Sequence, residues 1–247
     1  MTQSTAGRVC LPLAGELVAA RFVRRYKRFL IDAETDAGPI TAHANNTGSM
    51  LGLLRPGAAI ALSVSESPKR RLPYTLEMVR LPDFRGDFWV GVNTLVPNRL
   101  FRLGALFGAF PDLAGYDAVR SEPPFGGGRL DFLLTGPAGR CFVECKNVTM
   151  VEDGAAMFPD AATERGRKHL VELTRLAREG IDRAAIFFCV QRPDGDCFAP
   201  AAVIDPEYAD LLATAVAAGV LVLPYRAKVT ETGIFLGERL PLARNGC

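Results

Sequence analysis

The chain has 247 residues, of which 49% are hydrophobic and 23% charged, with a formal net charge of +2, which suits one large or two small globular domains. It contains no run of 18 apolar residues and does not begin with the basic-then-apolar order of a signal peptide, so we expect a cytoplasmic protein with no membrane partner. Six cysteines without a Cys-x-x-Cys spacing and only 2 histidines argue against a zinc cage or a disulfide framework.

Positive charge is concentrated in the first third of the chain. Residues 1–85 hold 12 Lys and Arg against 7 Asp and Glu, whereas residues 86–247 hold 17 against 20. This excess indicates a polyanion partner for the first part. Short strand-like segments separated by turns predict a small all-β barrel there. Its expected strands are Leu17–Phe22, Tyr26–Ala33, Ala58–Ser65 and Tyr74–Val79.

The most basic segment of the expected barrel spans residues 21–29, where five basic side chains alternate with three aromatic rings. Basic and stacking groups together suit single-stranded or distorted nucleic acid. A solvated edge strand that blocks aggregation is the alternative. Two loops, Asn45–Ser49 and Pro68–Arg71, could bind phosphate or be ordinary loops. The predicted nucleic-acid contacts of this half are Arg24, Arg25, Tyr26, Lys27, Arg28, Asn46, Thr47, Lys69, Arg70 and Arg71.

Strands and helices alternate in the expected second domain. This alternation predicts an α/β domain in which helices cover a mixed sheet, and an α+β chain overall. On the helix over residues 160–179, Arg165, Lys168 and His169 share one face, which could contact phosphates or simply be solvated. Helices are expected from Pro97 toward Phe107, over 160–179 and over 206–218, and buried strands at Ala184–Val190 and Val220–Tyr225.

A predicted β-hairpin carries the candidate chemistry. Strand formers at 129–134 and 141–146 flank a Gly-Pro-Ala-Gly turn, and a symmetric hairpin places Asp131 directly opposite Glu144. Their Cβ atoms would lie ~4.5–5.5 Å apart, close enough to share a cation. The two-residue period of a strand puts Lys146 on the face of Glu144 and turns the odd-numbered residues of that strand toward the core.

The residue types of this hairpin suit metal-dependent phosphodiester hydrolysis. Opposed carboxylates repel unless a cation lies between them, and oxygen ligands favour Mg²⁺ or Mn²⁺ over zinc. Hydrolysis also needs a positive group that orients water and stabilises developing charge, a role that fits Lys146. The alternative is that Asp131 and Glu144 are exposed hairpin residues and Lys146 is their ion-pair partner. The metal site is favoured because Glu144 and Lys146 lie on a strand directly after a hairpin turn, which is the structural context that this motif requires.

Segments spread over nearly the whole chain resemble one family, the sugar fermentation stimulation protein A family of bacteria and archaea. This resemblance implies an OB-like barrel, taken as residues 1–85, followed by a PD-(D/E)xK nuclease-like α/β domain, taken as residues 86–247. It also implies DNA binding, the property commonly attributed to the family. The segments that carry the resemblance are Arg24–Phe29, Asn46–Met50, Gly91–Thr94, Pro97–Asn98, Arg129–Leu133, Glu144–Thr149, Phe158–Ala161 and Glu164–Leu170.

The nuclease motif of the family falls on three residues of this chain, Asp131, Glu144 and Lys146. The resemblance thus implies a Mg²⁺ or Mn²⁺ ion held by Asp131, Glu144 and the backbone carbonyl of Cys145. Nucleases of this type often carry a further acidic ligand upstream, and that position falls on Glu122. Pro159-Asp160 is not the motif, because no Glu-x-Lys follows it.

Three functions compete at this stage. The leading one is a metal-dependent nuclease that acts on DNA, with RNA as a further option. The second is a non-catalytic DNA-binding regulator of transcription in sugar (maltose-type) metabolism, built on a nuclease scaffold, although no helix-turn-helix signal supports it. The third, a sugar-converting enzyme, rests on the family name alone. The sequence has no Gly-rich phosphate loop, so we expect no nucleotide cofactor.

Overall fold

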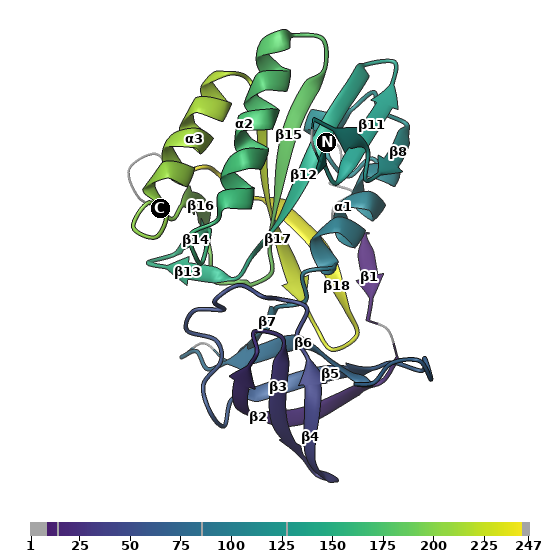
Figure 1. The fold of residues 1–247 in the computed structure, drawn as a ribbon, viewed down its shortest axis with the longest axis vertical. Coiled ribbons are helices and arrows are strands. Elements are labelled where there is room, and N and C mark those ends of the chain that lie inside the picture. Colours follow the sequence, from purple (N-terminus) through teal and green to yellow (C-terminus); the bar gives the residue numbers. More distant parts are fainter. Residues whose placement is uncertain (1–8, 14, 85, 127, 244–247) are drawn as a thin grey trace.

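Two β-rich bodies are stacked along the long axis of the molecule (Figure 1). The computed structural model describes residues 9–13, 15–84, 86–126 and 128–243. A barrel forms the lower body in this view, and a sheet covered by helices forms the upper one. None of the helices within the described ranges is long and apolar enough to cross a membrane.

The lower body is a closed β-barrel with one extra strand. β2 pairs with β3 and β5, β3 pairs with β4, and β5 pairs with β6. A parallel bridge between His43 and Thr75 joins β4 to β6 and closes the ring. The predicted OB-like barrel is therefore confirmed, and it has five strands where four were expected. Its strands are β2 (Leu17–Tyr26), β3 (Leu30–Thr35), β4 (Gly38–His43), β5 (Ala59–Val64) and β6 (Tyr74–Leu81), and β7 (Phe88–Gly91) extends the sheet beyond β6.

The basic segment folds differently from expectation. β2 continues to Tyr26, which therefore ends one strand instead of beginning the next. The turn that follows includes Lys27 and Arg28, with φ angles of +47° and +64°, a left-handed backbone that residues other than glycine rarely adopt. β4 was not predicted, because Pro39 and polar residues interrupt its apolar pattern. The expected domain boundary at residue 85 falls inside the barrel sheet, since β7 pairs with β6.

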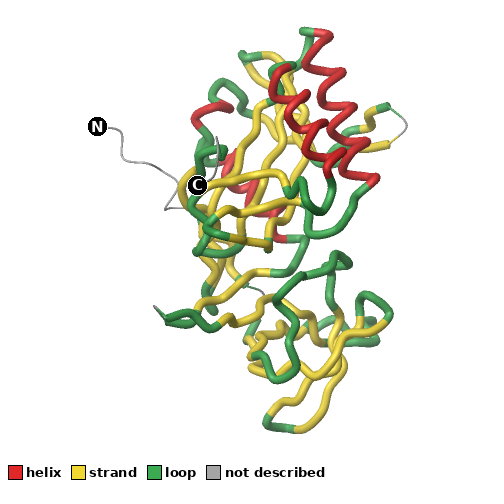
Figure 2. The backbone as a smooth tube through the Cα atoms, turned by 90° about the vertical axis from the view of Figure 1, so that its left-hand side faces the viewer, coloured by secondary structure: helices red, strands yellow, loops and turns green. Residues whose placement is uncertain are grey.

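The upper body is a seven-stranded mixed sheet between layers of helices. β12, β15 and β17 are parallel, whereas the outer strands are antiparallel to their neighbours. α1 (Val96–Leu106) packs on one face of the sheet, and α2 (Glu164–Glu179) and α3 (Pro206–Ala217) pack on the other (Figures 1 and 2). The expected mixed α/β domain is confirmed. In sheet order the strands are β1 (Cys10–Pro12), β18 (Gly233–Arg239), β17 (Leu221–Val229), β15 (Arg183–Val190), β12 (Gly139–Val148), β11 (Phe132–Gly136) and β8 (Ala118–Ser121).

The helices begin and end where local signals place them. α2 starts one residue after Thr163, whose side chain accepts a hydrogen bond from the Gly166 N–H, and it ends before Gly180, whose φ is +69°. This cap explains why the helix begins later than residue 160. The helices are α1 (Val96–Leu106), α2 (Glu164–Glu179) and α3 (Pro206–Ala217), and the minor elements are η2 (Pro111–Leu113), β9 (Pro124–Phe125), β10 (Gly128–Arg129), β13 (Met150–Glu152), β14 (Ala155–Phe158) and β16 (Cys197–Pro200).

The alternation of side chains along β12 divides the sheet into two cores. Cys141, Val143 and Cys145 pack with residues of α1, whereas Phe142 and Val148 pack with residues of α2 and α3. Each fully buried side chain of this size stabilises the fold by roughly 1.5–3 kcal/mol. The predicted core face of this strand is therefore confirmed. Free thiols occur at Cys10, Cys141, Cys145 and Cys189, and three of these, Cys141, Cys145 and Cys189, are buried.

Asp160 joins the barrel to the upper body. Its Oδ2 accepts a hydrogen bond from the Met50 N–H at 2.8 Å, and its carbonyl oxygen accepts one from Ser49 Oγ at 2.6 Å. Gly48 permits this approach, because a Cβ at that position would lie 3.0 Å from Asp160 Oδ1. The acidic residue beside Pro159 thus has a structural role at the junction of the two bodies.

We expect Asp160→Ala to lower the free energy of unfolding by about 1–3 kcal/mol, the typical effect of a lost hydrogen bond to a charged group. Chemical denaturation followed by circular dichroism measures this change. Asp210→Ala, which removes an exposed carboxylate on α3, is the control and should change stability by less than ~0.5 kcal/mol. Equal stability of the two variants would show that the Asp160 contact contributes nothing.

Candidate metal centre

The predicted hairpin is formed by β11 and β12. Their Cα partners run from Phe132 and Val143 to Gly136 and Gly139, so the same register places Asp131 opposite Glu144. Asp131 itself lies in the bend immediately before β11. The symmetric turn read from the sequence therefore gives the register that the two strands adopt.

Two hydrogen bonds from different elements hold the half-buried Asp131. Asn98 Nδ2, on the first turns of α1, donates to Oδ1 at 2.9 Å, and the Cys145 backbone N–H donates to Oδ2 at 2.7 Å. The N–H and C=O of one strand residue point to the same edge of the strand, so the Cys145 carbonyl is also directed toward Asp131. Each carboxylate oxygen keeps a free lone pair, because an ionised carboxylate can accept about four hydrogen bonds.

Glu144 is only 3% exposed, and its two oxygens have different surroundings. Oε1 accepts a hydrogen bond from Lys146 Nζ at 2.6 Å and contacts Nδ1 of His169. Lys146 Nζ in turn lies 3.2 Å from His169 Nδ1. Oε2 is buried and has no hydrogen-bond partner among the residues that the structure describes. Leaving a buried polar atom unsatisfied costs about 1–3 kcal/mol, and more for a charged group, and a bound cation would remove that cost.

The two carboxylates differ in acidity. Burial raises the pKa of Asp131, and the negative charge of Glu144 raises it further, against the hydrogen bonds from Cys145 and Asn98. Burial also acts to raise the pKa of Glu144, but Lys146 and His169 outweigh it, so this pKa lies below its usual value. Glu144 is therefore the ionised member of the pair, and Asp131 is the one that retains a proton more readily.

These pKa shifts predict that Mn²⁺ raises the melting temperature more at pH 8 than at pH 5. The pKa of Asp131 is higher in the folded metal-free protein than in the unfolded chain, so its protonation stabilises the fold at low pH and this contribution is lost as the pH rises through the raised pKa. A cation requires the ionised carboxylate and competes with that proton. Thermal unfolding with and without Mn²⁺ at both pH values measures the difference.

Asp131→Asn is the control for this measurement, because it removes both the charged ligand and the proton that competes with the ion. The difference between pH 5 and pH 8 should then shrink. Equal stabilisation of the unmodified protein by Mn²⁺ at both pH values would contradict the assignment of Asp131 as a ligand.

The donor set fits a magnesium-type ion. Within the described part of the chain, no group of three or more His, Cys, Asp or Glu side chains is placed to hold a metal. Mg²⁺ keeps several water molecules and is commonly bound by only one or two carboxylates, unlike a structural zinc ion. Asp131, Glu144 Oε2 and the Cys145 carbonyl provide such a set of hard oxygen donors, and the unpartnered Oε2 is the atom that a cation would satisfy.

The structure does not bring the side chain of Glu122 to this centre. Its backbone N–H donates to the Asp131 carbonyl oxygen at 2.9 Å. Its carboxylate instead pairs with Arg129 at 3.1 Å, and its side chain is 70% exposed. The predicted ligand role of Glu122 is corrected accordingly, because the turn after β8 directs this side chain to solvent.

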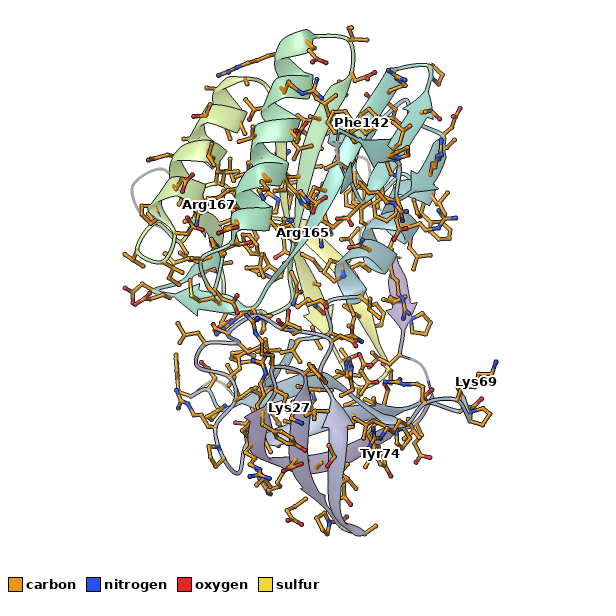
Figure 3. All side chains as sticks on the ribbon, in the orientation of Figure 1. Lys27, Lys69, Tyr74, Phe142, Arg165 and Arg167 are labelled. Carbon is orange, nitrogen blue, oxygen red and sulfur yellow. The ribbon has the colours of Figure 1, made fainter. Side chains whose placement is uncertain are left out.

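The predicted basic face of α2 divides into two parts. His169 was expected to contact phosphate, but it lies against Glu144 and Lys146 inside the centre. Arg165 and Lys168 are exposed. Figure 3 places Arg165 on the side of α2 toward β12, whereas Arg167 lies on the side toward α3, where it pairs with Glu207.

Several basic and polar residues of the barrel that were predicted to bind nucleic acid are engaged within the protein. The Arg25 guanidinium donates to the carbonyl oxygens of Arg28, Asn46 and Gly48 at 2.7, 3.0 and 2.8 Å. Arg24 Nε donates to Asp32 at 2.8 Å. The Tyr26 hydroxyl donates a hydrogen bond to Asp32, and Oδ1 of the buried Asn46 accepts one from the Gly48 N–H. Arg24, Arg25, Tyr26 and Asn46 thus stabilise the barrel itself.

The remaining predicted contacts of the barrel are exposed. Among the described residues, no carboxylate lies within ion-pair distance of the five basic side chains of this group, which are therefore available to an anionic ligand. Figure 3 shows Lys69 at the tip of a loop that projects to the side of the barrel. This group consists of Lys27, Arg28, Thr47, Lys69, Arg70 and Arg71.

Asn98 contacts the candidate centre but was not predicted from the sequence. It stood within the Pro97–Asn98 segment that resembles the family, but nothing in the local pattern pairs it with Asp131, which lies 33 residues away along the chain.

Comparisons with known proteins agree with this architecture. A model described as the SfsA N-terminal OB domain matches residues 23–92, and one described as the sugar fermentation stimulation protein RE domain matches residues 95–233. Sugar fermentation stimulation protein homologs from Syntrophobacter fumaroxidans and Geobacter sulfurreducens are 58% and 53% identical over 221 and 228 residues, which are 90% and 92% of this chain and 83% and 96% of theirs.

A solved structure resembles both bodies together. It is the structure of Pyrococcus furiosus SfsA in complex with Ca²⁺, which matches with a TM-score of 0.86 at 27% sequence identity, over 95% of this chain and 98% of that one. The barrel, the mixed sheet and the family models therefore lead to one assignment. The chain belongs to the sugar fermentation stimulation protein (SfsA) family, with an N-terminal OB domain and a restriction-endonuclease-like domain.

Proposed function

We propose that this protein is a Mg²⁺- or Mn²⁺-dependent nuclease that binds DNA and hydrolyses its phosphodiester bonds, with RNA as a second substrate to test. The observation that carries the proposal is the asymmetry of Glu144. Lys146 holds Oε1, while Oε2 is buried without a partner in the described part of the chain, within electrostatic range of Asp131. This is the arrangement of a carboxylate whose second oxygen is reserved for a cation.

Each residue of the centre has a distinct role in this proposal. Asp131, Glu144 Oε2 and the Cys145 carbonyl hold the ion, which would polarise the scissile phosphate and activate a water molecule. Asn98 fixes the orientation of Asp131 through its hydrogen bond to Oδ1. Lys146 orients the attacking water and stabilises the negative charge that develops on the phosphate.

Residues of α2 complete the centre. His169 touches both Glu144 and Lys146, so it limits the positions that the lysine ammonium can occupy. Arg165 and Lys168 are exposed on the same helix and can contact neighbouring phosphates. The Ca²⁺ complex of the Pyrococcus furiosus relative supports a divalent ion in this family, because Ca²⁺ also prefers oxygen ligands.

The test is cleavage of labelled single-stranded DNA, duplex DNA and RNA with Mg²⁺, with Mn²⁺ and with EDTA. We expect cleavage only with a metal present. Mn²⁺ binding followed by electron paramagnetic resonance is measured in parallel, so that a site without turnover can be recognised. No cleavage of any substrate with either metal would overturn the proposal.

The second candidate is a DNA-binding protein that regulates transcription without cutting. The observation that favours it is the set of uncompensated positive charges on the barrel, which are enough for binding by themselves. It predicts DNA binding that survives EDTA, falls steeply with salt and is accompanied by no cleavage. The same experiments therefore separate the two functions.

A further inference from the structure

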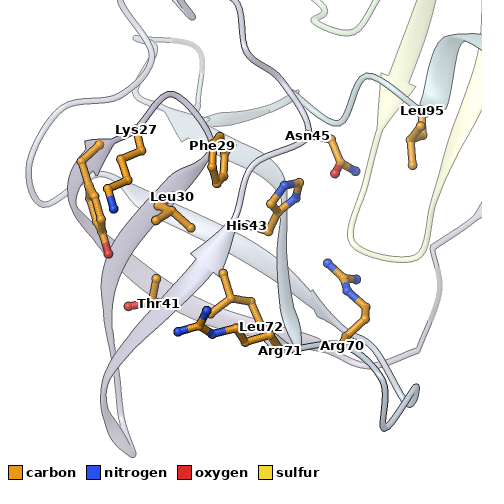
Figure 4. Close-up of a pocket in the computed structure, with 11 residues that line it drawn as sticks. Lys27, Phe29, Leu30, Thr41, His43, Asn45, Arg70, Arg71, Leu72 and Leu95 are labelled. Carbon is orange, nitrogen blue, oxygen red and sulfur yellow. The ribbon is translucent and has the colours of Figure 1, made fainter.

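A cavity of about 900 Å³ opens on the side of the barrel, next to the junction with the upper body (Figure 4). This volume lies toward the upper end of the range of small-molecule pockets, ~300–1,000 Å³. Residues of β3 and β4, of the turn between β2 and β3, and of the loop before β6 line it. No residue of the metal centre belongs to its wall, so it is a separate site.

Aromatic and aliphatic side chains form much of the wall. Phe29 is 43% exposed although it is a large apolar residue, and its ring lies 5.9 Å from that of His43, at an interplanar angle of 42°. Figure 4 shows both rings at the same opening, with Leu72 on the opposite wall. An apolar ring held at the mouth of a wide cavity is a surface on which a flat ligand can stack.

Three positive side chains surround these rings. Lys27, Arg70 and Arg71 all line the cavity and are exposed. Within the described ranges, no carboxylate lies in ion-pair distance of any of them, unlike Arg24, which pairs with Asp32. The charge of the wall therefore complements an anion, and its rings complement a planar group.

The turn that carries Lys27 is held in a conformation that L-residues disfavour. Lys27 and Arg28 have positive φ angles where hairpin turns usually use Asn and Gly. Arg25 Nε donates to the Arg28 carbonyl oxygen at 2.7 Å and fixes the turn. Strained backbone that the surrounding structure maintains is common at binding sites. This turn presents Phe29 and Lys27 to the cavity in a preorganised arrangement.

We propose that this cavity binds unpaired nucleotides of a polynucleotide, with bases stacked on Phe29 and His43 and phosphates bound by Lys27, Arg70 and Arg71. Bases of an intact duplex are stacked on one another and cannot use these rings, whereas an unpaired strand can. The preferred substrate is therefore single-stranded or locally unpaired nucleic acid. This inference rests on the proposed function and specifies its substrate class.

Helix α1 and its N-cap residue link the wall of the cavity to the metal centre. Leu95 lines the cavity and is the N-cap residue of that helix. Asn98, which holds Asp131, follows three residues later, a rise of about 4.5 Å along a helix. A strand bound on the barrel would therefore lie within a few nucleotides of the carboxylates.

The test is a double-mutant cycle between Phe29 and the bases of the ligand. Fluorescence anisotropy in EDTA, where no cleavage occurs, gives the affinity for an oligothymidylate of about 16 nucleotides, for its abasic counterpart and for a duplex. We expect Phe29→Ala to weaken binding of the normal strand by roughly tenfold to a hundredfold, in line with the loss of one stacked base. Affinity for the abasic strand and for the duplex should change by less than about twofold.

Two further variants control this experiment. Phe84→Ala removes an exposed aromatic ring that does not line the cavity, and it should leave all three affinities unchanged. Phe29→Tyr keeps a ring at the site and should restore binding of the normal strand. An equal loss on all three ligands, or no loss on any, would overturn the proposal.

The result is independent of whether the protein cuts. A selective effect of Phe29→Ala without any metal-dependent cleavage would support nucleotide binding in the cavity and contradict the proposed nuclease activity. The opposite result is cleavage that depends on Asp131 but shows no preference for unpaired strands, together with no effect of Phe29→Ala on binding. It would support the nuclease activity and contradict nucleotide binding in the cavity.

Discussion

Asp131→Asn should lower the rate of the proposed metal-dependent cleavage by at least roughly 10²–10³-fold, because it removes one of the two charged side chains that would hold the ion and so polarise the phosphate. The amide oxygen can still accept the hydrogen bond from the Cys145 N–H, and Asn98 can turn its own amide so that its oxygen accepts a hydrogen bond from the new NH2 group, so the hairpin should keep its geometry. Initial rates at saturating substrate with Mn²⁺ give the loss in turnover. Titration with Mn²⁺ gives the accompanying loss in metal affinity.

The effect of this substitution on stability distinguishes a lost ligand from a damaged fold. Burial and Glu144 raise the pKa of Asp131, so the ionised carboxylate is unfavourable in the metal-free protein. A neutral amide should therefore leave the metal-free melting temperature unchanged or raise it. A large drop would instead mean that the carboxylate has a structural role.

The matched control is Asp210→Asn, on the exposed side of α3. It changes the same chemical group at a position outside the centre, and it should leave the cleavage rate unchanged. If Asp131→Asn cuts as fast as the unmodified protein, the observed cleavage comes from another site or from a contaminant.

The parts of the site that the sequence predicted are those governed by local geometry. The period of a strand separates Glu144 and Lys146 from Cys145, and the symmetry of a short turn sets which residue opposes Glu144. Both depend only on residues within one hairpin. The register of β11 and β12 can therefore be predicted from the sequence of the hairpin alone, without knowledge of the rest of the fold.

The parts that the sequence did not predict depend on contacts between distant segments. Asn98 reaches Asp131 over 33 positions, and Ser49 reaches Asp160 over 111. β1 joins the sheet of the upper body through β18. A contact of this kind requires the relative position of whole elements, which no short pattern encodes. For the same reason, the expected domain boundary missed both β1 and β7.

Charge patterns were the least informative signal in the barrel. The run from Arg24 to Arg28 reads as one basic surface, yet Arg24 and Arg25 satisfy a carboxylate and three backbone carbonyls of the protein itself. Lys27 and Arg28 remain exposed at the turn. Which arginine is free depends on acceptors that come from other strands and loops. The composition of the segment predicts an anion-binding region but does not show which of its basic residues are free to bind an anion.

Lys146→Met should lower cleavage by about 10²–10³-fold while leaving Mn²⁺ binding largely intact, because it removes the positive charge that orients water and stabilises the phosphate but no ligand of the ion. The methionine has a similar length and keeps the packing of the stem. Comparison of the cleavage rate with the Mn²⁺ dissociation constant measures this separation. Lys228→Met, at an exposed position on β17, is the matched control and should affect neither quantity.

The same variant also tests how the centre balances its charges. Removing Lys146 leaves the buried Glu144 carboxylate with His169 as its remaining ion-pair contact, and breaking a buried ion pair typically costs about 3–5 kcal/mol. We therefore expect Lys146→Met to destabilise the metal-free protein and Mn²⁺ to restore much of the loss, since the ion supplies the missing positive charge. Cleavage at the unmodified rate would exclude Lys146 from the reaction. A loss of Mn²⁺ binding as large as the loss of turnover would place the lysine in ion binding instead.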